Sequence, residues 1–243
     1  MIEIKENNVI SMTKEIKSNL ITYLSFLFIS AVGIYIGNAF FSDFKSLRIW
    51  EYTNILFLLL GIPFLFLQSK AKLPNFWQEN ISNKNRFIFP IAIGLLFGIL
   101  DVLVFKVIMH PEPFQELPPY TQPFPYSLFL YFSGAFEVEV FYRLIPLTII
   151  LWFGNWFRKG KYYMTFFWIA AILTSVREPI EQISQGSILL IGYALLTGLL
   201  MNFSQALWYR KAGFLASLSI RLGHYLIWHI LLGIYIEFWE VLK

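Results

Sequence analysis

Blocks of about twenty apolar residues, separated by short polar stretches, recur along the whole chain. A helix that rises 1.5 Å per residue needs about 20 apolar residues to cross the ~30 Å hydrocarbon core of a bilayer. The pattern therefore predicts an all-α, polytopic transmembrane bundle of about seven spans, with six to eight possible. The predicted spans are residues 20–41, 52–68, 87–109, 127–153, 162–177, 186–207 and 213–236.

Two stretches depart from regular helix patterning. The segment 52–68 is short and contains Gly61 and Pro63, so we expect it to be bent or re-entrant. The stretch 111–125 cannot be helical throughout, because it contains six prolines. It also lacks lysine and arginine, and we expect an extended external loop, which is either a connector or a lid over an outward-facing site.

These patterns divide the chain into three regions. Residues 1–19 form a polar segment, which we expect to be cytoplasmic. Residues 20–125 contain three spans and the proline-rich loop, and residues 126–243 form a core of four spans. The first apolar block starts near Leu20, farther from the start than the apolar part of a signal peptide, so we expect a retained anchor.

Composition supports a membrane protein whose main partner is the lipid bilayer. The chain is 57% hydrophobic, whereas soluble domains are about 45–50% apolar. It has no cysteine, which excludes disulfides, thiolate metal sites and a cysteine nucleophile. The net charge of +4 is modest, and its distribution indicates orientation rather than nucleic-acid binding.

Orientation follows from the basic residues. Of 19 lysines and arginines, twelve lie on the side of the predicted membrane that holds the N-terminus, four lie opposite, and three lie within spans. Basic loops stay in the cytoplasm. We therefore expect an integral cell-membrane protein with a cytoplasmic N-terminus and an external C-terminus.

The fourth predicted span contains three charges, Glu137, Glu139 and Arg143. A charge at bilayer depth costs a few kcal/mol or more, so it requires a partner or a function. Glu139 and Arg143 are four residues apart and can form an ion pair on one helical face, whereas Glu137 points about 200° away from Glu139. Pro146 removes an amide donor and frees the carbonyl of Tyr142, so we expect a kink there.

Other polar groups lie in neighbouring spans. The fifth span ends in Arg177, Glu178 and Glu181, and the seventh contains Arg221, His224 and His229. By helical rise, Glu139 and His224 both lie near the bilayer midplane, so one polar cluster from spans four, five and seven is geometrically allowed. Asp101 and Lys106 in the third span are about 140° apart, and we do not expect them to pair. Asn202, on a small-residue stripe of the sixth span with Ala194 and Gly198, is expected at a helix–helix contact.

The order of these motifs over residues 127–232 resembles the CaaX protease and bacteriocin-processing family of intramembrane endopeptidases. Members typically have Glu-Glu-x-x-x-Arg, then Phe-x-x-x-His, then His-x-x-x-Asn or Asp. Glu139 and Arg143 match the second glutamate and the arginine, and His224 falls at the histidine of the last motif. Residues 198–216 are similar to the family's connecting stretch, with Asn202 in place of a glycine.

The chain departs from the family pattern at three motif positions. Val138 stands at the position of the first glutamate, with Glu137 displaced from it by one residue. Arg177 or Glu178 stands at the middle histidine, and Trp228 at the final Asn or Asp.

The resemblance implies an intramembrane glutamate-type endopeptidase with a CaaX-protease-like four-helix core and no cofactor. It would cleave a membrane-associated peptide or protein through a base-activated water. Glu139 or Glu137 would be the base, Arg143 would orient a carboxylate and His224 would assist. Arg177, Glu178, Trp228 and Asn202 occupy positions suited to stabilising the oxyanion or binding substrate.

Other hypotheses remain open. The chain can be a catalytically inactive relative that acts as a membrane scaffold or binds a partner protein, with Glu139 and Arg143 as a structural ion pair. It can also be an ion-coupled transporter, in which Asp101 and Lys106 participate. A metal site is not predicted, because the chain has no His-Glu-x-x-His motif and His224 and His229 do not share a helical face. The oligomeric state is left open.

Overall fold

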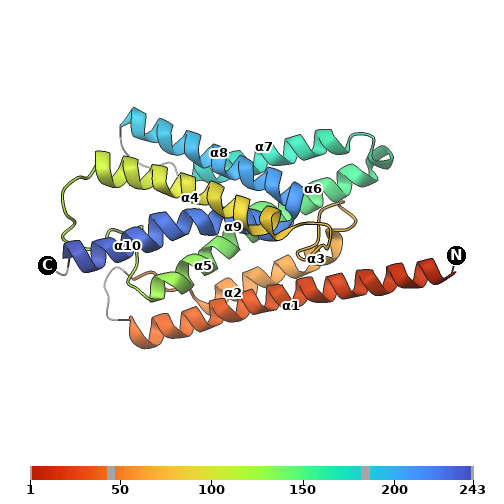
Figure 1. Cartoon of the computed structure of the whole chain (residues 1–243), viewed down its shortest axis with the longest axis horizontal. Coiled ribbons are helices and arrows are strands. Elements are labelled where there is room, and N and C mark those ends of the chain that lie inside the picture. Colours follow the sequence, from red (N-terminus) through yellow and green to blue (C-terminus); the bar gives the residue numbers. More distant parts are fainter. Residues whose placement is uncertain (1, 43–46, 182–186, 242–243) are drawn as a thin grey trace.

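Each hydrophobic segment that the sequence predicts lies in a helix. The computed structural model describes residues 2–42, 47–181 and 187–241, and within them it contains helices and loops but no strand. The helices run roughly along one long axis (Figure 1). They are α1 Ile2–Phe40, α2 Tyr52–Leu58, α3 Ile62–Leu67, α4 Phe89–Asp101, α5 Tyr126–Glu139, α6 Ile145–Trp156, α7 Tyr163–Glu181, α8 Ile188–Ala212, α9 Phe214–Tyr225 and α10 Leu232–Tyr235.

Several of these helices are joined end to end by turns of a different pitch. A 3₁₀ turn at Leu59–Gly61 joins α2 to α3, at the place where Gly61 and Pro63 predict an irregularity. Wider π-helical turns, which follow an i→i+5 pattern, extend the other rods. They are Lys84–Ile88 and Val102–Ile108 on either side of α4, Val140–Leu144 between α5 and α6, Leu226–Leu231 between α9 and α10, and Ile236–Val241 after α10.

The described helices support insertion into a membrane. Four helical stretches among the described residues are long and apolar enough to cross a bilayer: Lys14–Phe40, Lys84–Ile108, Ile188–Ala212 and Phe214–Val241. The stretch Tyr52–Leu67 is apolar but shorter. The all-α bundle is thus confirmed, and the number of crossings stays a prediction.

The boundaries differ from the predicted ones mainly at the ends. Helix α1 already begins at Ile2, so the polar residues 2–19 belong to the first helix instead of preceding it. Helix α8 continues to Ala212, and the last rod reaches Val241. The predicted start of the sixth span at residue 186 lies outside the described residues.

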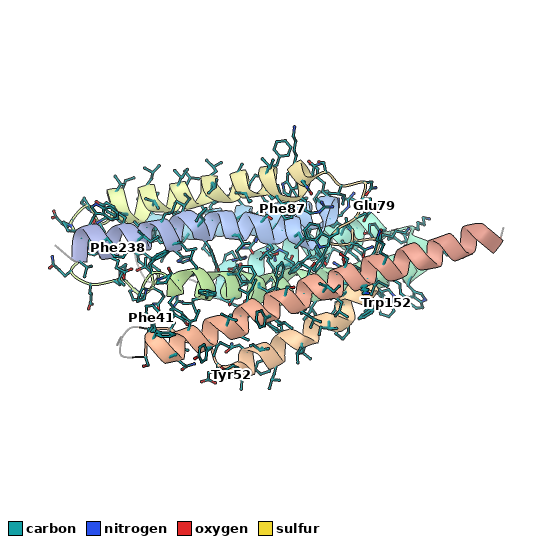
Figure 2. The ribbon with its side chains drawn as sticks, turned by 60° about the horizontal axis from the view of Figure 1, so that its bottom comes forward. Phe41, Tyr52, Glu79, Phe87, Trp152 and Phe238 are labelled. Carbon is teal, nitrogen blue, oxygen red and sulfur yellow. The ribbon has the colours of Figure 1, made fainter. Side chains whose placement is uncertain are left out.

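Large apolar side chains cover the outside of the bundle, as lipid contact requires. Figure 2 shows side chains projecting outward along its length, with Tyr52, Trp152 and Phe238 among those labelled. All three are among the exposed large hydrophobic residues. The outer surface therefore matches a hydrocarbon environment better than water.

Helix α9 forms the centre of the molecule, and ten of its twelve residues are buried. It packs against α4 backbone to backbone: a Cβ added at Gly94 would lie 1.9 Å from the Ile220 carbonyl oxygen. A Cβ at Gly223 would likewise lie 2.5 Å from the Ile91 carbonyl oxygen. Small residues allow this close approach between membrane helices. It brings Asp101, at the end of α4, beside His224 on α9.

Candidate functional site

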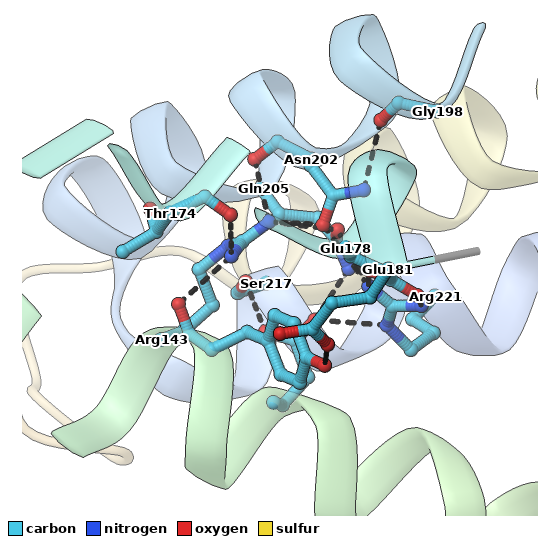
Figure 3. A network of polar contacts seen from close by, with 11 residues as sticks. Arg143, Thr174, Glu178, Glu181, Gly198, Asn202, Gln205, Ser217 and Arg221 are labelled. Carbon is cyan, nitrogen blue, oxygen red and sulfur yellow. Dashed lines mark hydrogen bonds and ion pairs between the residues drawn. The ribbon is translucent and has the colours of Figure 1, made fainter. Parts of the chain in front are cut away.

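A fully buried network of charged side chains lies where α5, α7, α8 and α9 meet (Figure 3). Arg221 of α9 is its centre. The two terminal nitrogens of Arg221 donate to the Glu178 oxygens at 2.7 and 2.6 Å, a bidentate contact. Its Nε donates to Glu139 Oε1 at 3.2 Å. One guanidinium therefore bridges carboxylates from α5 and α7.

Glu139 is enclosed on all sides, with no exposed surface. Gln205 of α8 donates a hydrogen bond to Oε1, and Ser217 of α9 donates one to Oε2. Together with Arg221, these donors occupy both carboxylate oxygens. Arg221 links Glu139 to Glu178, so the network joins the fourth and seventh predicted spans to the end of the fifth, as in the predicted cluster, and Gln205 adds the sixth.

Arg143 is also completely buried. Among the described residues, however, Glu139 forms its ion pair with Arg221 and not with the predicted partner, Arg143. The Arg143 guanidinium instead donates to the carbonyl of Thr174 at 3.1 Å and to the carbonyl and side-chain oxygens of Asn202. The π-helical turn Val140–Leu144 lies between Glu139 and Arg143 and changes their relative direction. The predicted pairing assumed a regular α-helix across this point.

The freeing of the Tyr142 carbonyl by Pro146 and the predicted direction of Glu137 are both confirmed, and the kink expected at Pro146 stays a prediction. The Tyr142 carbonyl accepts a hydrogen bond from Arg143 Nη1 at 2.8 Å. Glu137 is half-buried and is hydrogen-bonded to the side chain of Asn54 on α2. It therefore faces a different helix from Glu139, and no contact joins it to the network among the described residues.

A cavity of about 330 Å³ lies beside this network, between α4, α8 and α9. Its polar wall includes Glu178, Asn202 and Arg221 from the network, together with Asp101 and His224. Among the described residues, neither Glu139 nor Arg143 belongs to the cavity wall. The network thus forms part of the cavity wall, while Glu139, the candidate general base, lies behind that wall.

Aromatic side chains also line the cavity. They are Phe97, Phe105, Tyr120, Tyr225 and Trp228. Trp228 stacks on Tyr120, with 4.7 Å between ring centroids and 10° between ring planes. Trp228, which stands at the position of the family's final Asn or Asp, therefore supplies an apolar face and not an amide or a carboxylate.

Asp101 and His224 form a contact that the sequence does not predict. Asp101 Oδ2 lies 2.7 Å from His224 Nε2, and the Tyr193 hydroxyl donates to Asp101 Oδ1 at 2.8 Å. His224 Nδ1 is buried without a hydrogen-bond partner in the described part of the chain. The two residues are 123 positions apart, so only the α4–α9 packing brings them together.

Arg177 lies outside the site. It is half-exposed at the end of α7, where its Nε is 2.8 Å from Glu181 Oε1. Its guanidinium lies over the Tyr142 ring, 4.2 Å from the ring centroid. Of the two residues that can replace the family's middle histidine, the structure brings Glu178 to the cavity and leaves Arg177 at the helix end.

The proline-rich loop packs against the end of the last rod. Its Phe114 amide donates to Glu240 at 2.8 Å, and its Phe124 amide donates to Glu237 at 2.9 Å. Glu240 also pairs with Lys106 at 2.9 Å, so Lys106 and Asp101 have separate partners, as predicted. The loop contributes Tyr120 to the cavity wall and so helps to enclose it, which both the connector and the lid hypothesis allow.

Tyr120 itself is held at the cavity by its backbone. Its carbonyl accepts a hydrogen bond from the Tyr131 hydroxyl at 2.8 Å and lies against His229 Nδ1. Burial and, to a lesser extent, the Glu240 carboxylate raise the pKa of Tyr120 to about 12. The ring therefore enters the cavity wall as a neutral phenol at physiological pH.

Fold and site together define a membrane-embedded helical protein with a cavity beside a buried ion-pair network. No family model, curated protein or solved structure matches the chain. Within the described residues, no three His, Asp or Glu side chains are grouped closely enough to hold a metal ion.

Proposed function

We propose that this chain is a catalytically inactive relative of the CaaX protease and bacteriocin-processing endopeptidases, and that it binds a membrane-associated peptide or protein at the cavity. One observation carries the proposal: Glu139 is sealed, with donors on both carboxylate oxygens. A general base needs a water, or the proton that it removes, within hydrogen-bond reach. Glu139 has neither an exposed surface nor a place in the cavity wall.

The positions that differ from the family motifs support the same interpretation. Val138 replaces the first glutamate, and Glu178, one of the two candidates for the middle histidine position, is locked to Arg221 by two short hydrogen bonds. Both glutamates of the network are thus held by Arg221, and Glu139 has no access to a water in the cavity. The buried glutamates then have a structural role, holding α5, α7 and α9 together.

The cavity supports the binding part of the proposal. Ligand sites are concave, mostly apolar and lined by a few convergent polar groups. This cavity is lined by aromatic rings and by the polar side chains of Asp101, Asn202 and His224. A hydrophobic peptide segment that carries one polar group matches both kinds of side chain.

A library of hydrophobic, photo-crosslinkable peptides, offered to the reconstituted protein, tests the proposal. We expect specific crosslinking without cleavage products in mass spectrometry. Ala194→Trp, which fills the cavity from α8, should abolish crosslinking, and Gly192→Trp should not, because open space surrounds Gly192 on the same helix. Crosslinking that survives Ala194→Trp would overturn cavity binding.

Peptide hydrolysis is a second candidate function, and the Asp101–His224 contact favours it. A carboxylate that holds a histidine by one ring nitrogen is a common way to orient a general base. Asn202 and Arg221 in the same wall could act as donors to a developing oxyanion. In this case the base is His224, whose buried Nδ1 would become accessible to water only when its surroundings move, and Glu139 is structural.

Variants separate the two functions. Hydrolysis by His224 predicts cleavage that His224→Ala abolishes without lowering the unfolding temperature. The Glu137→Gln/Glu139→Gln double variant should then keep its turnover. Loss of cleavage in the double variant, at unchanged stability, would instead assign the base to a glutamate and would contradict the proposed inactive state.

A further inference from the structure

The charges around the cavity do not balance. Among the described residues, three carboxylates, Asp101, Glu139 and Glu178, lie in the network or the cavity wall, and the guanidiniums there are those of Arg143 and Arg221. The cations that follow on neighbouring elements are already engaged, Lys106 with Glu240 and Arg177 with Glu181. Unless something adds a positive charge, one negative charge remains uncompensated at bilayer depth, which is costly.

A charged His224 would leave one of its two N–H groups without a hydrogen-bond acceptor. Its side chain is nine-tenths buried, and an imidazolium needs an acceptor for each of its two N–H groups. Nε2 has one in Asp101, whereas Nδ1 has no partner in the described part of the chain. A neutral ring that donates from Nε2 leaves the Nδ1 lone pair without a donor, which also costs free energy in a buried site.

The charge deficit calls for a cation, and the cavity offers it an acceptor. Asp101 accepts two hydrogen bonds, and a carboxylate has about four lone-pair positions, so it can accept another. The cavity wall also contains Phe105, Tyr120 and Trp228, and the faces of aromatic rings attract cations. His224 Nδ1 is too enclosed to take part.

We propose that the cavity is a binding site for a primary ammonium group on an alkyl stem. The ammonium donates to Asp101 and balances the third carboxylate, and the stem lies along the aromatic side chains of the cavity. The proposal rests on the proposed binding function and names the chemistry of its ligand. A lysine side chain or N-terminus of a peptide, or an ethanolamine lipid headgroup, carries this group.

Calorimetric titration of the purified protein in neutral detergent tests the chemistry with small probes. At pH 7 we expect n-butylammonium to bind. The uncharged n-pentanol, similar in size, and potassium chloride at the same ionic strength should bind at least tenfold more weakly. Equal binding of n-pentanol would reduce the cavity to an apolar pocket, and equal binding of potassium would reduce it to a general cation site; either result overturns the proposal.

Variants locate the site. Asp101→Asn keeps the side-chain size and removes the charge, so n-butylammonium should bind at least tenfold more weakly. Glu181→Gln is the matched control, because Glu181 is an exposed carboxylate outside the cavity, and it should leave binding unchanged. Ala194→Trp gives an independent check if Asp101→Asn does not fold. Unchanged binding in a folded variant of either cavity residue would contradict the assignment.

A further pair of measurements distinguishes the sources of the ammonium. A peptide with a free N-terminus should bind more tightly than its acetylated form if the ligand is a peptide amine. Phosphatidylethanolamine nanodiscs should compete with n-butylammonium, and phosphatidylglycerol nanodiscs should not, if it is a headgroup. Equal binding of free and acetylated peptides, without competition by phosphatidylethanolamine, overturns the ammonium site and leaves peptide binding intact. Binding of n-butylammonium without any peptide retains the site and rejects the proposed function.

Discussion

Arg221 shows what a charge at membrane depth requires. Its guanidinium is almost completely buried and has contacts with Glu139, Glu178, Asn202 and Gln205. Moving two ions out of water costs free energy, so a buried ion pair adds little net stability. Removing one partner, however, leaves the other charge buried without a counter-charge. The free energy of unfolding should therefore depend strongly on this single residue.

We predict that Arg221→Met lowers the free energy of unfolding by about 3–5 kcal/mol, because it leaves two buried carboxylates without a cation. Arg177→Met is the control, since Arg177 also pairs with a glutamate but at an exposed helix end. Exposed pairs are worth about 0–1 kcal/mol. Denaturant unfolding in detergent measures both, and losses of equal size would show that burial does not decide the effect.

At the residue scale, the sequence predicts positions better than partners. Residue spacing on a regular helix correctly separates Glu137 from Glu139, and proline chemistry correctly frees the Tyr142 carbonyl. The partner of Glu139 is Arg221, on a helix far along the chain. Local spacing favoured Arg143, because spacing assumes a regular α-helix, whereas Arg143 lies in the π-helical turn Val140–Leu144 that follows Glu139.

At the element scale, π-helical turns adjoin the site on three rods. Val140–Leu144 follows Glu139, Val102–Ile108 follows Asp101, and Leu226–Leu231 follows Tyr225. Such turns often occur at functional sites, and each shifts the direction of the side chains that follow it. The apolar blocks predict the rods, because bilayer thickness fixes their length. They cannot predict these turns or the helical start at Ile2, because hydropathy marks apolar residues and not hydrogen-bond pattern.

The α4–α9 contact should be intolerant of even one methyl group. Gly94→Ala would place a Cβ against the Ile220 carbonyl oxygen, a backbone atom that cannot rotate away. We predict that it lowers the unfolding free energy by about 1–3 kcal/mol, the range for an overpacked core. It should also weaken ligand binding, because Asp101 lies on α4.

Gly134 of α5 provides the control for this substitution. A Cβ at Gly134 meets nothing within 4 Å, so Gly134→Ala should be neutral or stabilising by up to about 1 kcal/mol. Thermal unfolding of the two variants in the same detergent gives the comparison. A Gly94→Ala protein as stable as Gly134→Ala would show that α4 and α9 can separate without cost.

At the scale of the whole molecule, the ends of the bundle differ in charge. The two termini lie at opposite ends of the bundle in Figure 1. The α6–α7 turn lies at the same end as the start of α1, and the proline-rich loop lies at the other end. The α6–α7 turn contains Arg158, Lys159 and Lys161, whereas residues 111–125 contain no basic residue. By the positive-inside rule, we predict that the first end is cytoplasmic and the second external.

The absence of cysteine makes this orientation directly testable, because any introduced cysteine is the only reactive thiol in the chain. Glu116 and Lys159 are both exposed, at opposite ends of the bundle. A membrane-impermeant maleimide should modify Glu116→Cys in intact cells, and Lys159→Cys only after permeabilisation. The reverse pattern would invert the protein in the membrane. Modification of both in intact cells would place these two turns on one side, which contradicts a crossing by α5 and α6 and therefore the seven-span arrangement.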